Sequence, residues 1–459
     1  MFVDRQKELK VLEDEYKSSG FRFSIIYGRR RVGKTTLIKK YILNKPYIYF
    51  LVTLETLPSL LKRFKDLVAD FLDDEFLKNI ELKSFEQIFS YLSKQNLSKK
   101  LIIVIDEFQY LAKADKSIPS QFQYIVDEIL KNKNIHLILC GSIISMMYEQ
   151  TLSYNSPLYG RRTSSIKLEA LKFEYISQFF SKRDEIELIE LYAILDGVPK
   201  YLELFKDYSD IFEAIKVNIL DKNAFLYEEP RFILQNEVSE PVTYFSILEI
   251  IANGEHKIGN IASKLNKSVQ NITSFISKLI ELEIIYKDVP ITEKLPNKSK
   301  KGLYFIKDNF FRFWFSYVLP YKSQLEIGNI AYVLEVIKKD FSSFVSKVYE
   351  DLSIEFVLKN YHIQKAGRWW SKDEEIDIVG VAKDYLIVGE CKYSNKKVGI
   401  DILESLERKS QKIELKLPIK YYILFSKSGF TNKLIEVKNS RDDVILVDSL
   451  HIQKVHNNS

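Results

Sequence analysis

The chain has only two cysteines, Cys140 and Cys391, in 459 residues. They stand far apart in apolar runs, so their number alone excludes a disulfide framework and a cysteine zinc site. The five histidines show no ligand spacing. No stretch approaches the ~18 uncharged apolar residues of a transmembrane helix, and the residues after Met1 do not resemble a signal peptide. We therefore expect a cytoplasmic protein without membrane association.

Glycine is also scarce, with 15 residues against the roughly 30 that average usage would place in a chain of this length. Each glycine is therefore a marker of a place where the backbone needs one. Neither sign of charge dominates, since 68 Lys and Arg face 62 Asp and Glu, for a net charge of +6. That balance permits nucleic-acid binding without demonstrating it. The length predicts two to four globular domains.

Short apolar runs mark the first part of the chain. Residues 23–27, 101–105 and 135–140 are apolar, and each run ends at a glycine or an aspartate. Buried parallel strands have this composition. Helical patterns lie between them, as at 59–71 and 119–131. The alternation predicts an α/β domain with a parallel sheet.

A different unit occupies residues 241–302. Three helical patterns lead into a polar, basic stretch at 290–302 that strand-like segments flank, which is the layout of a winged helix-turn-helix. Residue types that contact phosphates and base edges surround the start of the third helix: Asn266, Lys267, Ser268, Gln270, Asn271 and Thr273. Contact with DNA and a role as a lid or protein-contact module are both open.

The last part of the chain begins with an aromatic stretch, 303–347, which we interpret as a helical connector with a packed core; a platform for base stacking is the alternative. A second α/β pattern follows. Its predicted elements are a helix at 348–360, strands at 375–381 and 385–392, a helix at 400–415 and a strand at 420–426.

Residues 28–35, Gly-Arg-Arg-Arg-Val-Gly-Lys-Thr, match G-x-x-x-x-G-K-[ST] between a predicted strand and a predicted helix. Gly28 and Gly33 let the backbone N–H groups face phosphate oxygens, and the helix N-terminus adds its positive end. Lys34 is expected to reach the β and γ phosphates, and Thr35 to offer its hydroxyl to Mg²⁺. The motif predicts a phosphate loop that binds ATP.

An acidic pair ends the second apolar strand, in LIIVIDEFQY. We expect Asp106 to hold Mg²⁺, directly or through water, and Glu107 to orient or polarise the attacking water. Beside a phosphate loop, this pair is typical of a Walker B motif.

Residues 1–205 resemble the archaeal ATPase family, a branch of the AAA+ and STAND nucleotide triphosphatases. VDRQKEL, with Arg5 and Glu8, looks like the adenine-proximal segment of that family, and DGVPKYL carries its G-x-P element. LILCGS resembles its sensor strand, which implies that Ser142 lies near the γ-phosphate. The chain has no clear sensor-2 arginine, a departure from ring-forming AAA+ proteins.

The same resemblance extends to PLYGRR, which looks like the family's arginine segment. It implies that Arg161 or Arg162 touches phosphate, within one chain or across two, and it leaves a homo-oligomer open. Motif and resemblance together predict these ATP-contacting residues: Gly28, Arg29, Arg30, Arg31, Val32, Gly33, Lys34, Thr35, Thr36, Ser142, Arg161 and Arg162.

A second candidate site lies near the C-terminus, in EIDIVGV and YLIVGECKY. Alternation places Glu390 and Lys392 on one face of their strand, and Asp377 belongs to the preceding strand of the same hairpin. Two carboxylates and a lysine can hold Mg²⁺ and activate water. The arrangement resembles the PD-(D/E)xK nuclease superfamily, in a domain of the DUF234 type. That resemblance adds Glu350 on the preceding helix, and FSKSGF at 425–430 resembles a late segment of such domains.

The predicted fold is α/β: an AAA+-like P-loop ATPase core (1–170), a helical lid (171–238), a winged helix (239–302), an aromatic connector (303–347) and a restriction-endonuclease-like domain (348–459). The predicted catalytic residues are Glu107, Asp377, Glu390 and Lys392, and the predicted metal ligands are Thr35, Asp106, Glu350, Asp377 and Glu390. The leading interpretation is a Mg²⁺-dependent ATPase coupled to DNA binding or cleavage. The alternatives are an ATP-switched regulator with an inert C-terminal domain, and a DNA-binding transcription factor with ATP as effector.

Overall fold

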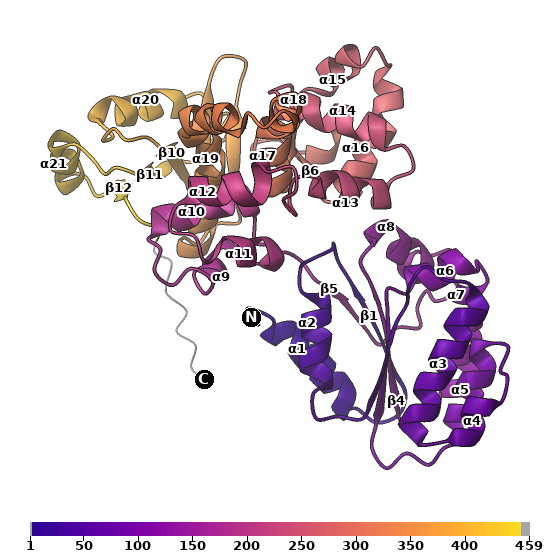
Figure 1. The fold of residues 1–459 in the computed structure, drawn as a ribbon. Coiled ribbons are helices and arrows are strands. Elements are labelled where there is room, and N and C mark those ends of the chain that lie inside the picture. Colours follow the sequence, from indigo (N-terminus) through magenta and orange to yellow (C-terminus); the bar gives the residue numbers. More distant parts are fainter. Residues whose placement is uncertain (1, 451–459) are drawn as a thin grey trace. The chain divides into compact units, whose positions relative to one another are not determined.

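The computed structural model describes residues 2–450, which form two compact units (Figure 1). The first unit contains the chain up to Leu171 together with residues 198–200 and 235–239. The second contains residues 172–197, 201–234 and the chain from Glu240 onward. No helix within residues 2–450 combines the length and the apolar character that crossing a bilayer requires.

The first unit is built on a parallel five-stranded sheet with the order β2-β3-β4-β1-β5. Its strands are β1 (Arg22–Tyr27), β2 (Tyr47–Leu51), β3 (Leu101–Asp106), β4 (Ile135–Gly141) and β5 (Ser164–Lys167). The three predicted strands are confirmed as the central ones, and β3 and β4 are buried along their whole length. The edge strands β2 and β5 were not predicted: β2 is a continuous apolar run, YIYFL, that was passed over, whereas β5, SSIK, has only one apolar residue.

Helices cover both faces of this sheet (Figure 1). One face packs against α1 (Gln6–Lys17) and α2 (Lys34–Ile42), and the other against α3 (Leu57–Leu72) and α5 (Phe85–Ser93). The unit also contains α4 (Glu75–Asn79), α6 (Gln109–Ala114), α7 (Ile118–Tyr124), α8 (Ile144–Met147) and π-helical turns at Ile125–Leu130 and Tyr148–Leu152. All three phosphate-site strands, β1, β3 and β4, end at the same sheet edge, because parallel strands run in one direction.

In the second unit, helices come before and after an antiparallel pair of short strands, β6 (Ile285–Asp288) and β7 (Leu303–Ile306). Three helices come directly before this hairpin: α14 (Pro241–Ala252), α15 (Ile258–Lys264) and α16 (Val269–Glu281). Outside the C-terminal sheet region, the further helices are α9 (Phe173–Ile176), α10 (Glu185–Leu195), α11 (Pro199–Phe205), α12 (Ile211–Ile215), α13 (Glu229–Glu237), α17 (Asn309–Tyr317) and α18 (Lys322–Glu326), with helical turns at Lys216–Leu220 and Pro296–Lys298. The start of α11 and the end of α13 belong to the first unit.

The aromatic side chains of α17 (Asn309–Tyr317), within the stretch 303–347, form part of the hydrophobic core, which agrees with the interpretation as a packed connector. In α17, six aromatic side chains are buried, including Phe310 and Trp314, and the Trp314 indole donates to the Tyr227 carbonyl oxygen at 2.6 Å. Buried rings with satisfied polar atoms cannot present a surface for base stacking.

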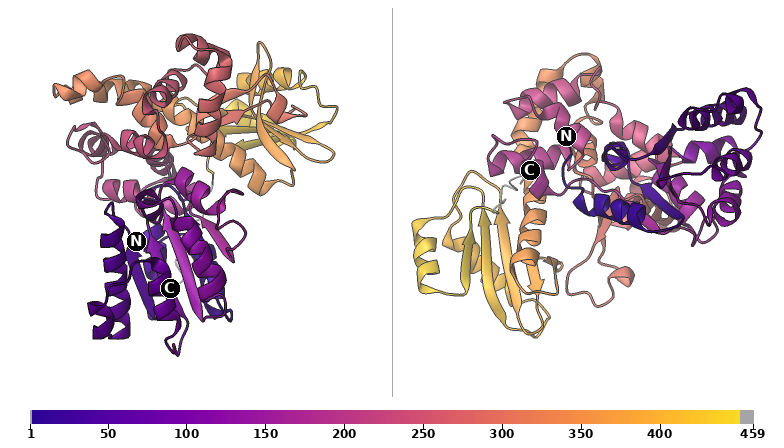
Figure 2. Two further views of the ribbon diagram at one scale, coloured as in Figure 1. Left: turned by 90° about the vertical axis from the view of Figure 1, so that its right-hand side faces the viewer. Right: turned by 90° about the horizontal axis from the view of Figure 1, so that it is seen from below.

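The C-terminal region forms a mixed sheet with the order β12-β11-β10-β9-β8, whose strands lie side by side in the right-hand view of Figure 2. Its strands are β8 (Lys365–Trp370), β9 (Glu375–Val381), β10 (Leu386–Lys392), β11 (Ile419–Ser426) and β12 (Val444–Val447); the helices are α19 (Ile330–Asn360), α20 (Ile400–Ser410) and α21 (Asn432–Ser440). β8, β9 and β10 pair antiparallel, whereas β10, β11 and β12 pair parallel.

Two boundaries in the second unit differ from the predicted ones. The second hairpin strand, β7, lies within the stretch predicted as connector, because it pairs with β6. The long helix α19 begins at Ile330 and runs through residue 348 without a break. Buried apolar residues recur along α19 from Val333 to Val357, so packing stabilises the whole helix and it does not begin at residue 348 as predicted.

Candidate functional site

The phosphate loop connects β1 to α2, and its glycines have the geometry that the motif implies. Gly33 is the N-cap of α2 with φ of 98°, in the left-handed region that favours glycine. A Cβ at Gly28 would lie 2.2 Å from the Leu168 carbonyl oxygen, so no side chain fits there. The two glycines therefore keep the backbone free of side chains beside the N-terminus of a nine-residue helix, where an anion is stabilised.

Lys34, the first residue of α2, lies inside this loop. Its side chain is 6% exposed, and Nζ donates to the carbonyl oxygens of Gly28 at 2.7 Å and Arg29 at 2.8 Å. Burial lowers the pKa of Lys34, and the nearby carboxylates of Asp106 and Glu107 oppose this effect. An ammonium group buried against neutral carbonyls is only partly compensated, which suits it to receive an anionic phosphate.

Arg5 ties the loop to the rest of the unit. Its guanidinium donates to the carbonyl oxygens of Val32 at 3.1 Å and Glu169 at 2.6 Å, and it pairs with Glu8 at 3.4 Å. Arg30, on the loop, donates to the Tyr110 hydroxyl at 2.8 Å. Thr36 is exposed and Val32 is buried in the core beneath the loop.

Thr35 and Asp106 meet beside the loop. The Thr35 hydroxyl donates to Asp106 Oδ2 at 3.4 Å, and the Tyr49 hydroxyl also donates to this oxygen. Hydroxyl and carboxylate oxygens are ligands that Mg²⁺ accepts together with nucleotide phosphates and water. These two residues therefore fit a magnesium ion, which when bound would neutralise charge on the phosphates.

Glu107 follows Asp106 with φ of 59°, a left-handed conformation that is uncommon for residues other than glycine. Its Oε2 accepts hydrogen bonds from the Ser142 amide at 3.2 Å and the Ser142 hydroxyl at 2.7 Å, and also from Gln109 Nε2. The predicted sensor residue Ser142 is thus in direct contact with the predicted water-activating residue. Gln109 was not predicted, although it stands in the same DEFQ segment.

The two predicted arginines differ in their surroundings. Arg161 is paired with Asp127, whose carboxylate oxygens accept from Arg161 Nε at 2.8 and 2.9 Å. Arg161 Nη1 donates to the Pro157 carbonyl oxygen at 2.7 Å. Arg162 Nη1 is buried and has no hydrogen-bond partner among the described residues. Both arginines directly precede β5, and Ser164 at the start of β5 pairs with Ser24 near the start of β1, so they lie toward the sheet edge opposite the phosphate loop. The predicted phosphate contact within one chain therefore does not fit this structure, and the contact across two chains stays a prediction.

The second candidate site lies where the pairing between β9 and β10 ends. Asp377 and Glu390 come directly beyond the last paired residues, Ile378 and Gly389. Asp377 Oδ2 accepts from the Cys391 amide at 2.8 Å. Burial, and then the charges of Glu390 and Glu350, raise the pKa of Asp377 well above its usual range. Such a shift is typical of carboxylates that share a site.

Glu390 has two cations beside it, as alternation predicted for Lys392. Its Oε1 accepts from Lys392 Nζ at 2.9 Å and Lys409 Nζ at 3.3 Å. Lys409 comes from α20 and has no sequence signal that links it to Glu390. Glu390 is 7% exposed, and its other oxygen, Oε2, is buried without a hydrogen-bond partner in the described part of the chain.

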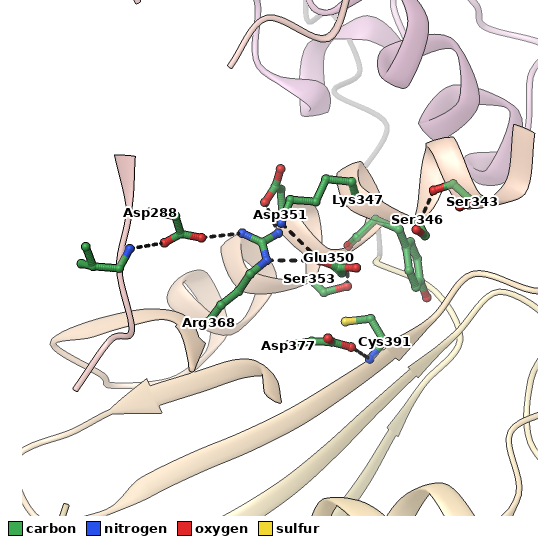
Figure 3. A network of polar contacts seen from close by, with 12 residues as sticks. Asp288, Ser343, Ser346, Lys347, Glu350, Asp351, Ser353, Arg368, Asp377 and Cys391 are labelled. Atoms are coloured by element: carbon green, nitrogen blue, oxygen red, sulfur yellow. Dashed lines mark hydrogen bonds and ion pairs between the residues drawn. The ribbon is translucent and has the colours of Figure 1, made fainter. Parts of the chain in front are cut away.

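Glu350 of α19 is paired with the cations of a charged cluster around Arg368, which Figure 3 shows together with Asp377 and Cys391. Its Oε2 accepts from Arg368 Nε at 3.1 Å, and Lys347 lies 3.6 Å from the same oxygen. The Arg368 guanidinium also contacts Asp351 and, at 3.4 Å, Asp288 of β6. Arg368 thus joins β8, α19 and the hairpin.

This pairing corrects the predicted set of metal ligands in the C-terminal region. Within residues 2–450, no three or more His, Cys, Asp or Glu side chains gather as metal ligands do. Glu350, Asp377 and Glu390 therefore do not form a three-carboxylate site in this structure, because Glu350 is bound by Arg368 and Lys347. Asp377, Glu390 and Lys392 remain as a smaller candidate constellation.

Replacing Arg368 by methionine is expected to destabilise the second unit by about 3 kcal/mol, because three carboxylates lose a shared, mostly buried cation. The measurement is the midpoint of urea unfolding. Arg408→Met is the matched control, since Arg408 is 59% exposed and pairs with Glu374 at the surface. Equal midpoints for the two variants would contradict a structural role for the Arg368 cluster.

The phosphate loop, the acidic pair after β3 and the parallel sheet define a P-loop ATPase that binds ATP. Residues 2–205 match the profile of an ATPase domain predominantly from Archaea, and residues 314–412 match a family of archaeal and bacterial proteins of unknown function. The Walker-type ATPase of Pyrococcus abyssi has the same fold, with a TM-score of 0.50 at 20% identity over 68% of this chain and 96% of its own.

Two relatives from Methanocaldococcus jannaschii are close in sequence. An uncharacterized protein is 39% identical over 439 residues, which are 93% of this chain and 96% of the relative. An uncharacterized ATP-binding protein is 53% identical over 45 residues, which are 10% of this chain and 76% of that protein. The chain belongs to the archaeal ATPase family.

Proposed function

We propose that this ATPase requires Mg²⁺ and that its nucleotide state governs the action of a C-terminal nuclease-like domain on DNA. The observation that carries the proposal is the Asp377, Glu390 and Lys392 constellation at the point where β9 and β10 stop pairing with each other. Glu390 keeps one buried oxygen without a partner, and the pKa of Asp377 is raised. A cation between the two carboxylates would relieve both conditions and would supply a polarised water.

Exposed polar and basic residues support DNA as the partner. Around the start of α16, the side chains of Lys267, Gln270 and Asn271 are exposed, and Ser268 caps the helix. The hairpin loop adds the exposed lysines Lys294, Lys298 and Lys300. A helix start with a basic hairpin beside it is the arrangement that winged helices use on DNA, in which lysines contact phosphates.

One observation favours a different function, an ATP-switched regulator with an inert C-terminal domain. Glu350, the third carboxylate that the nuclease resemblance implies, is bound to Arg368 and Lys347. A metal site with two carboxylates binds a divalent ion more weakly than one with three, because each lost oxygen ligand removes charge and coordination.

The test is cleavage of plasmid and branched DNA with Mg²⁺ or Mn²⁺, with and without ATP. We expect wild-type protein to cut, and Asp377→Asn and Lys392→Met to reduce cutting at least about 100-fold, as loss of a metal ligand or a charge-stabilising group does. EDTA should abolish the cleavage in the same way.

Asp384→Asn is the matched control, because Asp384 is an exposed carboxylate in the turn between β9 and β10. It should cut as wild type does. Wild-type protein that cuts no DNA with either metal, in either nucleotide state, would favour the regulator.

A further inference from the structure

Gln109 is a buried polar residue that neither the phosphate-loop motif nor the acidic pair accounts for. It is the first residue of α6 and its side chain is fully buried. Its amide nitrogen donates to Glu107 Oε2. Its amide oxygen, Oε1, is buried and has no hydrogen-bond partner in the part of the chain that the structure describes.

An orphaned amide oxygen argues against a purely structural role. A buried acceptor without a partner costs about 1–3 kcal/mol, and an apolar side chain of similar length would fill the same space without this cost. The amide cannot turn over to relieve it, since its oxygen would then face the Glu107 carboxylate. The side chain is held in the orientation that serves Glu107.

The sheet edge is also shaped around this amide. A Cβ at Gly141 would lie 2.3 Å from Gln109 Oε1 and 2.3 Å from Met147 Sδ. Gly141 ends β4 immediately before Ser142, which is the other donor to Glu107. One scarce glycine therefore makes room for the Gln109 amide beside the residue that supplies the other donors to Glu107.

We propose that Gln109 is a positioning residue for ATP hydrolysis, which together with Ser142 fixes Glu107 through Oε2 and presents Oε1 to the attacking water. All three donors to the Glu107 carboxylate converge on Oε2. In the hydrolytic step, the water oxygen bonds to the γ-phosphorus and the bond to the β-phosphate oxygen breaks. The water proton passes to Oε1, and the products are ADP and inorganic phosphate. The inference rests on the predicted role of Glu107 as the group that activates water.

The test is Gln109→Met, which keeps the length of the side chain and removes the donor. We expect kcat to fall about 10- to 100-fold, the range for loss of a hydrogen bond to a charged group. KM for ATP should stay unchanged because Gln109 does not belong to the phosphate loop, and the melting temperature should be unchanged or higher because the orphaned oxygen is gone. Leu111→Met, a buried apolar change in the same helix, is the control and should leave kcat unchanged.

A double-mutant cycle with Glu107→Gln separates positioning from an independent effect. If Gln109 acts through Glu107, adding Gln109→Met to Glu107→Gln lowers kcat no further. The same fold-loss in both backgrounds would overturn the proposal, and so would an unchanged kcat or a raised KM in the single variant. If Gln109→Met does not fold, Gln109→Leu takes its place in the cycle. Full activity of Glu107→Gln alone would instead show that Glu107 is not the group that activates water.

Discussion

Replacing Lys34 by methionine is expected to lower kcat/KM for ATP by about 10³-fold or more, because the ammonium is the charge that the loop directs at the phosphates. Nζ lies within hydrogen-bond distance of the two carbonyl oxygens of Gly28 and Arg29. Arrival of phosphate gives it anionic partners, whereas a methionine sulfur offers no donor. Hydrolysis is measured by phosphate release, and binding by the shift in melting temperature that ATP produces.

Lys65→Met is a close control for this variant. Lys65 lies in α3 of the same unit, is 7% exposed, and donates through Nζ to the carbonyl oxygens of Lys78 at 2.7 Å and Ile80 at 2.9 Å. Both substitutions thus remove a buried ammonium from two carbonyls, but only Lys34 belongs to the phosphate loop. We expect Lys65→Met to lower stability and to keep ATP hydrolysis. Retained turnover in Lys34→Met would refute the phosphate-loop assignment.

Glu107→Gln should lower kcat by about 10²–10⁴-fold, the range for loss of a general base. Glutamine has nearly the same shape, and its amide oxygen can still accept from the Ser142 hydroxyl, so the site should keep its structure. ATP should therefore still raise the melting temperature. This combination, binding without turnover, distinguishes the Glu107 variant from Lys34→Met, which should lose both.

Glu128→Gln serves as the control for this second variant, because Glu128 is an exposed carboxylate in the same unit. It removes the same charge at the surface and should leave kcat unchanged. A Glu107→Gln protein that hydrolyses ATP at the wild-type rate would show that another group activates the water.

Much of the first unit could be predicted because its signals are local. The phosphate loop is eight consecutive residues, and the strands β3 and β4 are continuous apolar runs that must be buried on both faces. The edge strand β5 has no such local signal. Its sequence, SSIK, has one apolar residue, and its pairing with β1 identifies it as a strand.

In the C-terminal region, the alternation of side chains along a strand predicted some of the contacts of the site and not others. It placed Glu390 and Lys392 on one face, and their side chains are in contact at 2.9 Å. It could not show that Lys409 approaches the same carboxylate from α20, or that Arg368 binds Glu350. Those contacts depend on how helices pack on the sheet, which a strand's own periodicity does not contain.

By itself, therefore, the sequence determined an α/β P-loop ATPase, with its phosphate loop, its acidic pair and its few indispensable glycines, because each of these is written in consecutive residues. Only the tertiary structure decided which side chains serve the site. It brought Gln109 and Ser142 onto one oxygen of Glu107, and it engaged Arg161 with Asp127. The physical reason is that backbone conformation follows from local residue types, whereas hydrogen bonds between side chains depend on the distances and rotamers that packing of remote segments imposes.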